Sequence, residues 1–479
     1  MNIKFESSYT TLPSVFFRPV LPTPVKKPNL IIWNEALAKE LGITELSDTE
    51  KSEVFSGNSV IPGSTPIAQA YAGHQFGNFT MLGDGRAILL GEIPLSEKER
   101  RDVQLKGSGR TPFSRGGDGR ATLSAMLREY IISEAMYHLG IPTTRSLAVV
   151  ETGEFVYRET KNTGAVLTRV AKSHIRVGSF EYAYQYIDTT ALKNLTDYTI
   201  KRHYPECLTK ENPVLEFFKS VVYKQLDLII NWLRVGFIHG VMNTDNMSIS
   251  GETIDYGPCA FMNVYKPQTV FSSIDMGGRY AFGNQPAIAH WNLASLANSL
   301  LPLIDTDMNT AIQLVRQTLD EYSENFQTKY WEMIGKKMGF PNVGEKEISL
   351  GKDLLEWMEK NLADYTNTFL VLEEKDTSST GIFSDQIFIE LKTRMIELKK
   401  QTGIDENVSL SLMNENNPYV IPRNHKVEKA LEKARSGDYS AFYELIELLK
   451  NPYLRRKDLD FHTEIPPGGD VGYKTFCGT

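Results

Sequence analysis

The segment Phe237–Pro258, FIHGVMNTDNMSISGETIDYGP, constrains the fold of this chain more than any other stretch. Asn246 is followed by two β-type runs, MSIS and TIDY, around a Gly-Glu turn, which predicts two short strands. This order brings Asn246 and Asp255 together at the end of a short hairpin. Amide and carboxylate oxygens are the hard ligands that Mg²⁺ prefers. The segment therefore predicts a metal site.

The spacing from His239 to Asn246 matches the kinase catalytic loop H-R-D-x-x-x-x-N, and Asp255 in IDYGP stands where the kinase DFG aspartate does. The position of the catalytic aspartate, however, holds Val241, which cannot accept a proton. We expect Asp245 to replace it, because a carboxylate there could accept a hydroxyl proton or orient the attacking group. The alternative is an Asx-rich loop whose side chains only bond to their own turns.

Two glycine-rich turns precede this segment. MLGDGRAILLGE supplies Gly83 and Gly85, and RGGDGR supplies Asp118 and Gly119. Where no Cβ intrudes, the backbone can approach a phosphate closely. The alternative is that these glycines only form ordinary tight turns between strands.

Basic residues gather around these turns. Lys106 ends a short β-type run, as the phosphate-pairing lysine of kinases does, and Glu129 in the following helix could pair with it. The apolar stripe of that helix, however, is better centred on Glu134. Guanidinium groups suit phosphate oxygens, and the arginines near the turns are Arg86, Arg110, Arg115, Arg120, Arg169 and Arg176. In an acidic protein this clustering predicts a polyphosphate pocket, with solvated surface as the alternative.

Strand and helix patterns divide the chain. Short β-type runs before residue 170 are interrupted by one helix pattern over 121–140. Apolar residues at spacings of three and four predict a buried helix over 213–236, and the pattern beyond 285 is mostly helical. These patterns predict a two-lobed α+β enzyme. Its predicted parts are an N-terminal extension (1–60), an N-lobe with nucleotide-binding loops (61–170), and a C-lobe with catalytic loop, metal turn, helical region and cysteine-containing tail (171–479).

Composition narrows the function classes. A net charge of −7 argues against nucleic-acid or anionic-membrane binding. The three cysteines, Cys207, Cys259 and Cys477, have no zinc-ligand spacing and are too few for a disulfide scaffold. The N-terminus lacks a signal-peptide layout, and no long uncharged apolar run occurs, so we expect a cytoplasmic protein. No coiled-coil pattern is evident, so we expect a monomer. His138, His174 and His290 are interpreted as structural.

Several long motifs together resemble the selenoprotein O family nearly from end to end. They are AQAYAGHQFGNFTMLGDGRAILLGE, QLKGSGRTPFSRGGDGRATL, SEAMYHLGIPTTRSL, HGVMNTDN, DYGP, QPAIAHWNLASLA and the tail PPGGDVGYKTFCGT. The resemblance implies a protein-kinase-like fold that transfers AMP from ATP, and in some members UMP from UTP, to Ser, Thr or Tyr hydroxyls of proteins. Self-modification is included, pyrophosphate leaves, and Mg²⁺ or Mn²⁺ assists. The nucleotide lies flipped, with its α-phosphate toward the acceptor.

The resemblance also implies roles for individual residues. Asp245 matches the catalytic base, Asn246 and Asp255 match the metal ligands, and Glu129 matches the ion-pair partner of the phosphate lysine. The implied nucleotide contacts are Gly83, Gly85, Arg86, Lys106, Asp118, Gly119, Arg169 and Arg176. Redox control in some family members implies a disulfide from the tail cysteine, here Cys477, to one in the activation segment, where this chain has only Cys259. Two unpaired thiols are the alternative.

Two other functions remain open from the sequence. One is a kinase that transfers the γ-phosphate, although small-molecule kinases of the aminoglycoside type place an aspartate where this chain has Val241. The other is a catalytically inactive pseudokinase scaffold. The retention of Lys106, Asn246 and Asp255 argues against the scaffold, which has no need of metal ligands.

Overall fold

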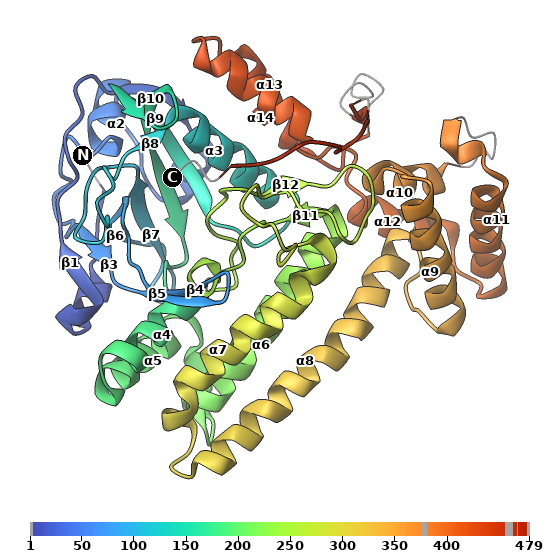
Figure 1. Cartoon of the computed structure of the whole chain (residues 1–479), viewed down its shortest axis with the longest axis horizontal. Coiled ribbons are helices and arrows are strands. Elements are labelled where there is room, and N and C mark those ends of the chain that lie inside the picture. Colours follow the sequence, from blue (N-terminus) through green and yellow to red (C-terminus); the bar gives the residue numbers. More distant parts are fainter. Residues whose placement is uncertain (1–2, 375–380, 456–462, 467, 477–479) are drawn as a thin grey trace.

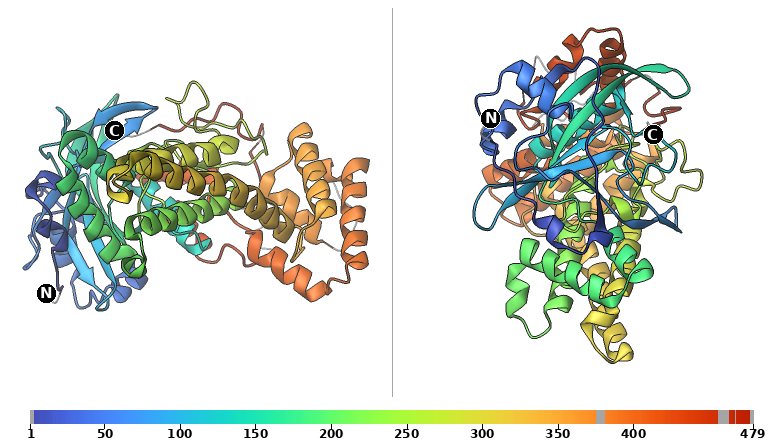
Figure 2. Two further views of the ribbon diagram at one scale, coloured as in Figure 1. Left: turned by 90° about the horizontal axis from the view of Figure 1, so that it is seen from below. Right: turned by 90° about the vertical axis from the view of Figure 1, so that its left-hand side faces the viewer.

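A computed structural model describes residues 3–374, 381–455, 463–466 and 468–476 of the chain. A twisted sheet occupies one end of an elongated molecule, long helices lead away from it, and a helical group forms the far end (Figures 1 and 2). The predicted α+β class is confirmed to this extent: helices are combined with an antiparallel sheet. Within the described residues, no helix is long and apolar enough to cross a membrane.

The main sheet has eight strands in the order β1-β3-β6-β7-β10-β9-β2, with β8 paired to β10. Its strands are β1 (Phe17–Pro19), β2 (Asn29–Trp33), β3 (Ile67–Gln69), β6 (Ala87–Pro94), β7 (Arg100–Lys106), β8 (Ala121–Thr122), β9 (Arg145–Tyr157) and β10 (Lys161–Ala171). Two separate two-stranded sheets are formed by β4 (Ala72–Gln75) with β5 (Asn78–Met81), and by β11 (Phe237–Ile238) with β12 (Ala260–Phe261). Strands β1 and β2 lie within the predicted N-terminal extension but belong to the main sheet; the boundary at residue 60 stays a prediction.

The helices follow the sheet in sequence, apart from three that precede or interrupt it. These three are α1 (Glu35–Glu40), α2 (Asp48–Phe55) and α3 (Leu123–His138). The others are α4 (Val177–Tyr186), α5 (Thr189–His203), α6 (Pro213–Val235), α7 (Gln285–Ile304), α8 (Met308–Lys337), α9 (Glu345–Lys360), α10 (Tyr365–Glu373), α11 (Gln386–Gln401), α12 (Glu406–Asn416), α13 (Asn424–Arg435) and α14 (Ser440–Leu449). Short 3₁₀ turns are η1 (Ser8–Thr11), η2 (Ser14–Phe16), η3 (Pro205–Thr209), η4 (Thr244–Asn246), η5 (Phe282–Asn284) and η6 (Gly381–Ser384).

Local signals define the two helices that frame the site. The side chain of Thr122 caps α3 by accepting a hydrogen bond from the Ala125 amide. At α6, Asn212 caps the first turn in the same way, and Gly236 ends the helix with φ 74°, a left-handed conformation that glycine adopts without a Cβ penalty. The helices predicted over 121–140 and 213–236 are confirmed.

One local prediction is wrong. MSIS and TIDY do not pair with each other: the Ile249 amide donates to the Ile175 carbonyl, and the Thr253 amide donates to the Pro142 carbonyl. Long-range partners replaced the local ones. The helical pattern beyond 285 is confirmed, and Leu362, with φ 55°, lies between α9 and α10.

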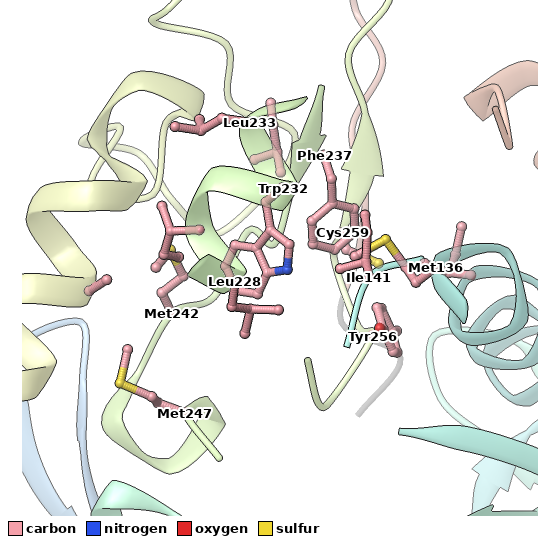
Figure 3. Packing of buried hydrophobic residues seen from close by; sticks show 14 of the residues in the cluster. Met136, Ile141, Leu228, Trp232, Leu233, Phe237, Met242, Met247, Tyr256 and Cys259 are labelled. Atoms are coloured by element: carbon pink, nitrogen blue, oxygen red, sulfur yellow. The ribbon is translucent and has the colours of Figure 1, made fainter. Parts of the chain in front are cut away.

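Apolar packing holds the segment 237–258 in place. Trp232 of α6 lies edge-to-face on Phe237, with ring centroids 5.4 Å apart, and stacks on His239 at the same distance. Figure 3 shows Trp232 between Met242 and Phe237, with Tyr256 and Cys259 facing Met136 of α3. The loop that carries the polar residues is thus anchored from both sides by buried side chains.

Candidate active site

Four charged side chains from four parts of the chain meet in one buried cluster. The ammonium of Lys106, at the end of β7, lies 2.6 Å from Glu129 Oε2 and 3.0 Å from Asp255 Oδ1. Arg169 of β10 donates two hydrogen bonds to Glu129 Oε1 and one, of 2.7 Å, to Asp255 Oδ1. Glu134 lies elsewhere on the face of α3 and pairs with Arg145. The helix thus offers Glu129, not Glu134, to Lys106.

Arg176 connects this cluster to the catalytic loop. Its Nη1 donates to the backbone carbonyl of Asp245 and to Asp255 Oδ2, both at 2.9 Å. Its Nη2 lies 3.7 Å from the buried Asp84, and its guanidinium covers the ring of Tyr71 at 4.4 Å. Asp84 also accepts hydrogen bonds from the Gln69 amide and from the Gln104 side chain.

The cations control the ionisation of the cluster. Burial alone would favour a neutral Asp255, but Arg169, Lys106 and Arg176 hold the pKa of its carboxyl well below the usual range. Burial opposes the charge of Glu129 too, yet Arg169 and Lys106 lower its pKa. Both carboxylates are therefore ionised at neutral pH and available to cations.

Asp245 occupies a different environment one turn away. Its side chain is 7% exposed, and its Oδ1 has no hydrogen-bond partner within the described ranges. Burial raises the pKa of Asp245 to about 6, with Arg176 acting in the opposite direction. The carboxylate fits against Gly73, where an added Cβ would come within 2.4 Å of Oδ1. Asp245 is thus a buried carboxyl group that titrates near neutral pH.

Asn246 follows Asp245 in the sequence, and a hydrogen bond fixes the orientation of its side-chain amide. Its Nδ2 donates to the carbonyl of Val241 at 3.0 Å, while no described residue donates to its Oδ1. His239 supports the turn from behind, since its Nε2 lies 2.9 Å from the carbonyl of Ile254. Asp255 itself has φ 64°, a left-handed conformation that orients its carboxylate toward the three cations.

The glycine-rich turns pack on each other. An added Cβ at Gly83 would meet the ring of Phe113 at 2.5 Å, and the hydroxyl of Thr111 donates to the Asp84 carbonyl at 2.6 Å. The missing side chain at Gly83 therefore makes room for the second turn. Asp118 lies at the surface in an ion pair with Arg158, at 2.9 Å, and Gly119 lies next to it against Gly109. The structure does not bring Asp118 into the buried cluster.

A cavity of about 360 Å³ opens beside Lys106. Its lining includes Arg86, Lys106, Glu129, Tyr256, Thr475 and Phe476. The C-terminal tail forms one wall: the hydroxyl of Thr475 donates to the Pro258 carbonyl at 2.6 Å, and the Tyr473 hydroxyl lies 3.1 Å from Arg128. A pocket with several cationic groups and a lysine–carboxylate pair suits a phosphorylated ligand.

The remaining cysteines and histidines have ordinary surroundings. Cys259 is buried, and burial raises the pKa of its thiol to about 12; Cys477 lies outside the described residues. His174 is buried 3.0 Å from Asp102, and His290 Nε2 lies 3.2 Å from the Leu319 carbonyl. These histidine contacts are those of structural residues.

Sequence reasoning missed several residues around the site. Asp84 lies between the two glycines that the sequence singled out, but its contacts to Arg176 and Gln104 are long-range. The motif AYAGHQFG likewise marks His74, whose imidazole lies 2.6 Å from Glu181. The sequence signal that could have indicated Asp84 and His74 is that each is a polar residue inside a long motif.

The site is that of a protein that binds a phosphorylated ligand, and comparison with known proteins gives its family. A family model described as "Protein adenylyltransferase SelO" matches residues 1–450. The protein named "Protein nucleotidyltransferase YdiU" from Clostridium perfringens strain SM101 is 51% identical over 100% of this chain and 98% of its own. The protein of the same name from Pelagibacter ubique is also 51% identical, with 99% of both chains covered. The one from Geobacillus kaustophilus is 52% identical, with 99% of both chains covered. The chain belongs to the SelO family of protein adenylyltransferases.

Proposed function

We propose that this enzyme transfers AMP from ATP to Ser, Thr or Tyr hydroxyls of proteins, itself included, and releases pyrophosphate. The observation that carries this proposal is the position of Arg176, whose Nη1 bonds both to the Asp245 backbone and to the Asp255 carboxylate. A proposed base and a proposed metal ligand thereby flank one guanidinium.

Asp245 is the proposed base. Its unpaired Oδ1 and its pKa of about 6 suit a group that takes a hydroxyl proton near neutral pH. The acceptor oxygen then forms a bond to the α-phosphorus, the bond from that phosphorus to the bridging oxygen breaks, and pyrophosphate leaves with the bonding electrons. Val241 is buried and apolar, so it contributes no proton acceptor at the usual kinase position.

The cations are the proposed pyrophosphate side of the site. Lys106, Arg169 and Arg176 now neutralise Glu129 and Asp255. When the β- and γ-phosphates enter, these cations exchange part of their contact with Asp255 for phosphate oxygens. They stabilise the departing pyrophosphate, which the flipped orientation of the nucleotide brings to these cations. Gly83, Gly85, Arg86, Asp118 and Gly119 are proposed to contact the rest of the nucleotide.

The residues also fit a divalent metal. Asn246 presents an amide oxygen without a donor, and Asp255 presents an ionised carboxylate. Mg²⁺ and Mn²⁺ take hard oxygen ligands, and such an ion can share them with phosphates. Such an ion, when bound, neutralises phosphate charge; Asn246 and Asp255 would hold it.

A kinase-like division into two lobes is part of the proposal. Its support is the position of the cluster between the sheet, whose strands end at Ala171, and the helices that begin with α4. The bounds of 61–170 for the N-lobe and 171–479 for the C-lobe stay predictions. The cytoplasmic location and the monomeric state stay predictions.

The test uses purified enzyme, Mg²⁺ or Mn²⁺, and ATP labelled on the α- or the γ-phosphate. Label from the α-position alone should enter protein, and Asp255→Ala should abolish it. Label from the γ-position alone would mean a kinase. Nucleotide binding with no incorporation from either label would favour the scaffold. A parallel assay with α-labelled UTP measures the choice between AMP and UMP.

A further inference from the structure

The β4–β5 hairpin lies directly across the catalytic loop. The backbone amide of His74 donates to Thr244 Oγ1 at 2.7 Å, and the amide of Phe76 donates to Asn243 Oδ1 at 3.1 Å. Between them and the base there is no room for a side chain, since Gly73 fits against the Asp245 carboxylate. The hairpin is therefore the wall of the site next to the base.

One nitrogen of the His74 imidazole has a hydrogen-bond partner, and the other has none in the described part of the chain. Its Nδ1 lies 2.6 Å from Oε1 of Glu181 on α4, whose side chain is 4% exposed. We assign the hydrogen to Nδ1, with the Glu181 carboxylate as its acceptor, and this tautomer leaves the Nε2 lone pair as an acceptor. The His74 side chain is 26% exposed, and Nε2 has no hydrogen bond to the described part of the chain.

Aromatic side chains pack against the His74 ring. The His74 ring lies edge-to-face on Trp291, at 5.0 Å, and tilted on Phe79, at 4.9 Å. Phe79 stacks on the half-exposed Tyr186, and the Arg279 guanidinium covers Trp291 at 5.0 Å. Partly exposed aromatic rings beside a single oriented polar atom are suited to hold a polypeptide segment by its flanks.

We propose that His74 is an acceptor-binding residue: its Nε2 accepts a hydrogen bond from an N–H or hydroxyl of the protein segment that carries the modified side chain. Glu181 is the positioning residue that keeps Nε2 directed outward. This inference rests on the proposed function and adds the protein side of the site to it. The proton of the reacting hydroxyl still goes to Asp245.

The decisive variant is His74→Asn. The asparagine Nδ2 can take the place of Nδ1 and keep the bond to Glu181, but it has no atom at the position of Nε2. Transfer of α-labelled AMP is measured against increasing casein, a flexible protein acceptor. We expect KM for the acceptor to rise about tenfold in His74→Asn, with the Kd for ATP unchanged. His74→Gln, whose amide reaches farther, should recover part of the loss, and Glu181→Gln should also raise KM.

His290→Asn is the matched control, because His290 on α7 has a similar half-buried ring with a backbone partner at 3.2 Å. It should leave both constants unchanged. A wild-type KM in His74→Asn would overturn the inference and leave the proposed function intact. Absence of AMP transfer in the wild-type enzyme would overturn both. ATP binding by calorimetry shows that each variant is folded.

Discussion

A single nitrogen of Arg176 joins two aspartates of the site, bonding to the backbone of Asp245 and to the side chain of Asp255 at the same distance of 2.9 Å. The two carboxyl groups nevertheless have opposite properties. Asp255 faces three cations and stays ionised, whereas Asp245 is buried without a donor at Oδ1. One guanidinium thus separates a permanent anion from a titrating base.

Replacing Asp255 by Asn should reduce AMP transfer by about 10²–10³-fold, because the variant loses a charged ligand on the phosphate side. It also leaves Lys106, Arg169 and Arg176 without a shared counter-charge, so thermal unfolding should shift to lower temperature. Transfer of α-label and a melting curve measure the two effects. Full activity in this variant would exclude Asp255 from the proposed role.

The pH dependence of the transfer rate should follow the ionisation of Asp245. The rate of transfer at saturating ATP is expected to rise between about pH 5 and pH 7, with a midpoint near 6, as this carboxyl group loses its proton. In Asp245→Asn the rate should be lower by about two orders of magnitude and that rise should be absent. An unchanged midpoint in the residual activity of the variant would assign the titration to another group.

The same variant should be more stable than the wild type at neutral pH. The Asp245 pKa is about 6 in the folded chain against an ordinary value of 3.8, so folding takes up a proton between these values. Stability from this group is present below pH 3.8 and lost as pH rises through 6, in total about 3 kcal/mol. Asparagine avoids the loss, so Asp245→Asn should melt higher at pH 8 and close to wild type at pH 4. A lower melting temperature at pH 8 would contradict burial as the cause.

Glu129→Gln should lose both stability and activity. The carboxylate of Glu129 is shared by two buried cations, Lys106 and Arg169, and removing the charge of such a partner costs about 3–5 kcal/mol. Glu134→Gln is the control on the same helix: Glu134 is equally buried but pairs with Arg145 and Asn34. It should lower the melting temperature without lowering the transfer rate measured well below that temperature. Equal rate losses in both variants would indicate a general effect of α3.

Gly73→Ala should lower the rate by about 10²-fold, because the new methyl group displaces the Asp245 carboxylate. Gly277→Ala is the control, since an added Cβ there meets no atom within 4 Å. Nucleotide binding, followed by calorimetry, should be retained in both variants. A wild-type rate in Gly73→Ala would show that the hairpin yields easily and does not fix the base.

Local features that depend on neighbouring residues could be predicted. The helix over 213–236 follows from apolar spacing and ends at Gly236, and the helix over 121–140 has its own cap and stop. The conformation of residues 247–256 could not be predicted, because its two β-type runs form hydrogen bonds with distant segments at Pro142 and Ile175. Hydrogen bonds to distant backbone replaced an equally plausible local hairpin.

The sequence by itself determined which chemical groups this protein has and in what order: a lysine after a strand, an acidic helix, and the loop from His239 to Asp255 with valine at position 241. Tertiary structure decided how they are paired. Helix periodicity offers both Glu129 and Glu134 to the interior, and only the packing of α3 on the sheet gives Glu129 to Lys106. Lys106 and Asp255 are 149 residues apart, and a buried charge is costly unless an opposite charge faces it. Such pairing depends on burial and distance, which exist only once the chain has folded.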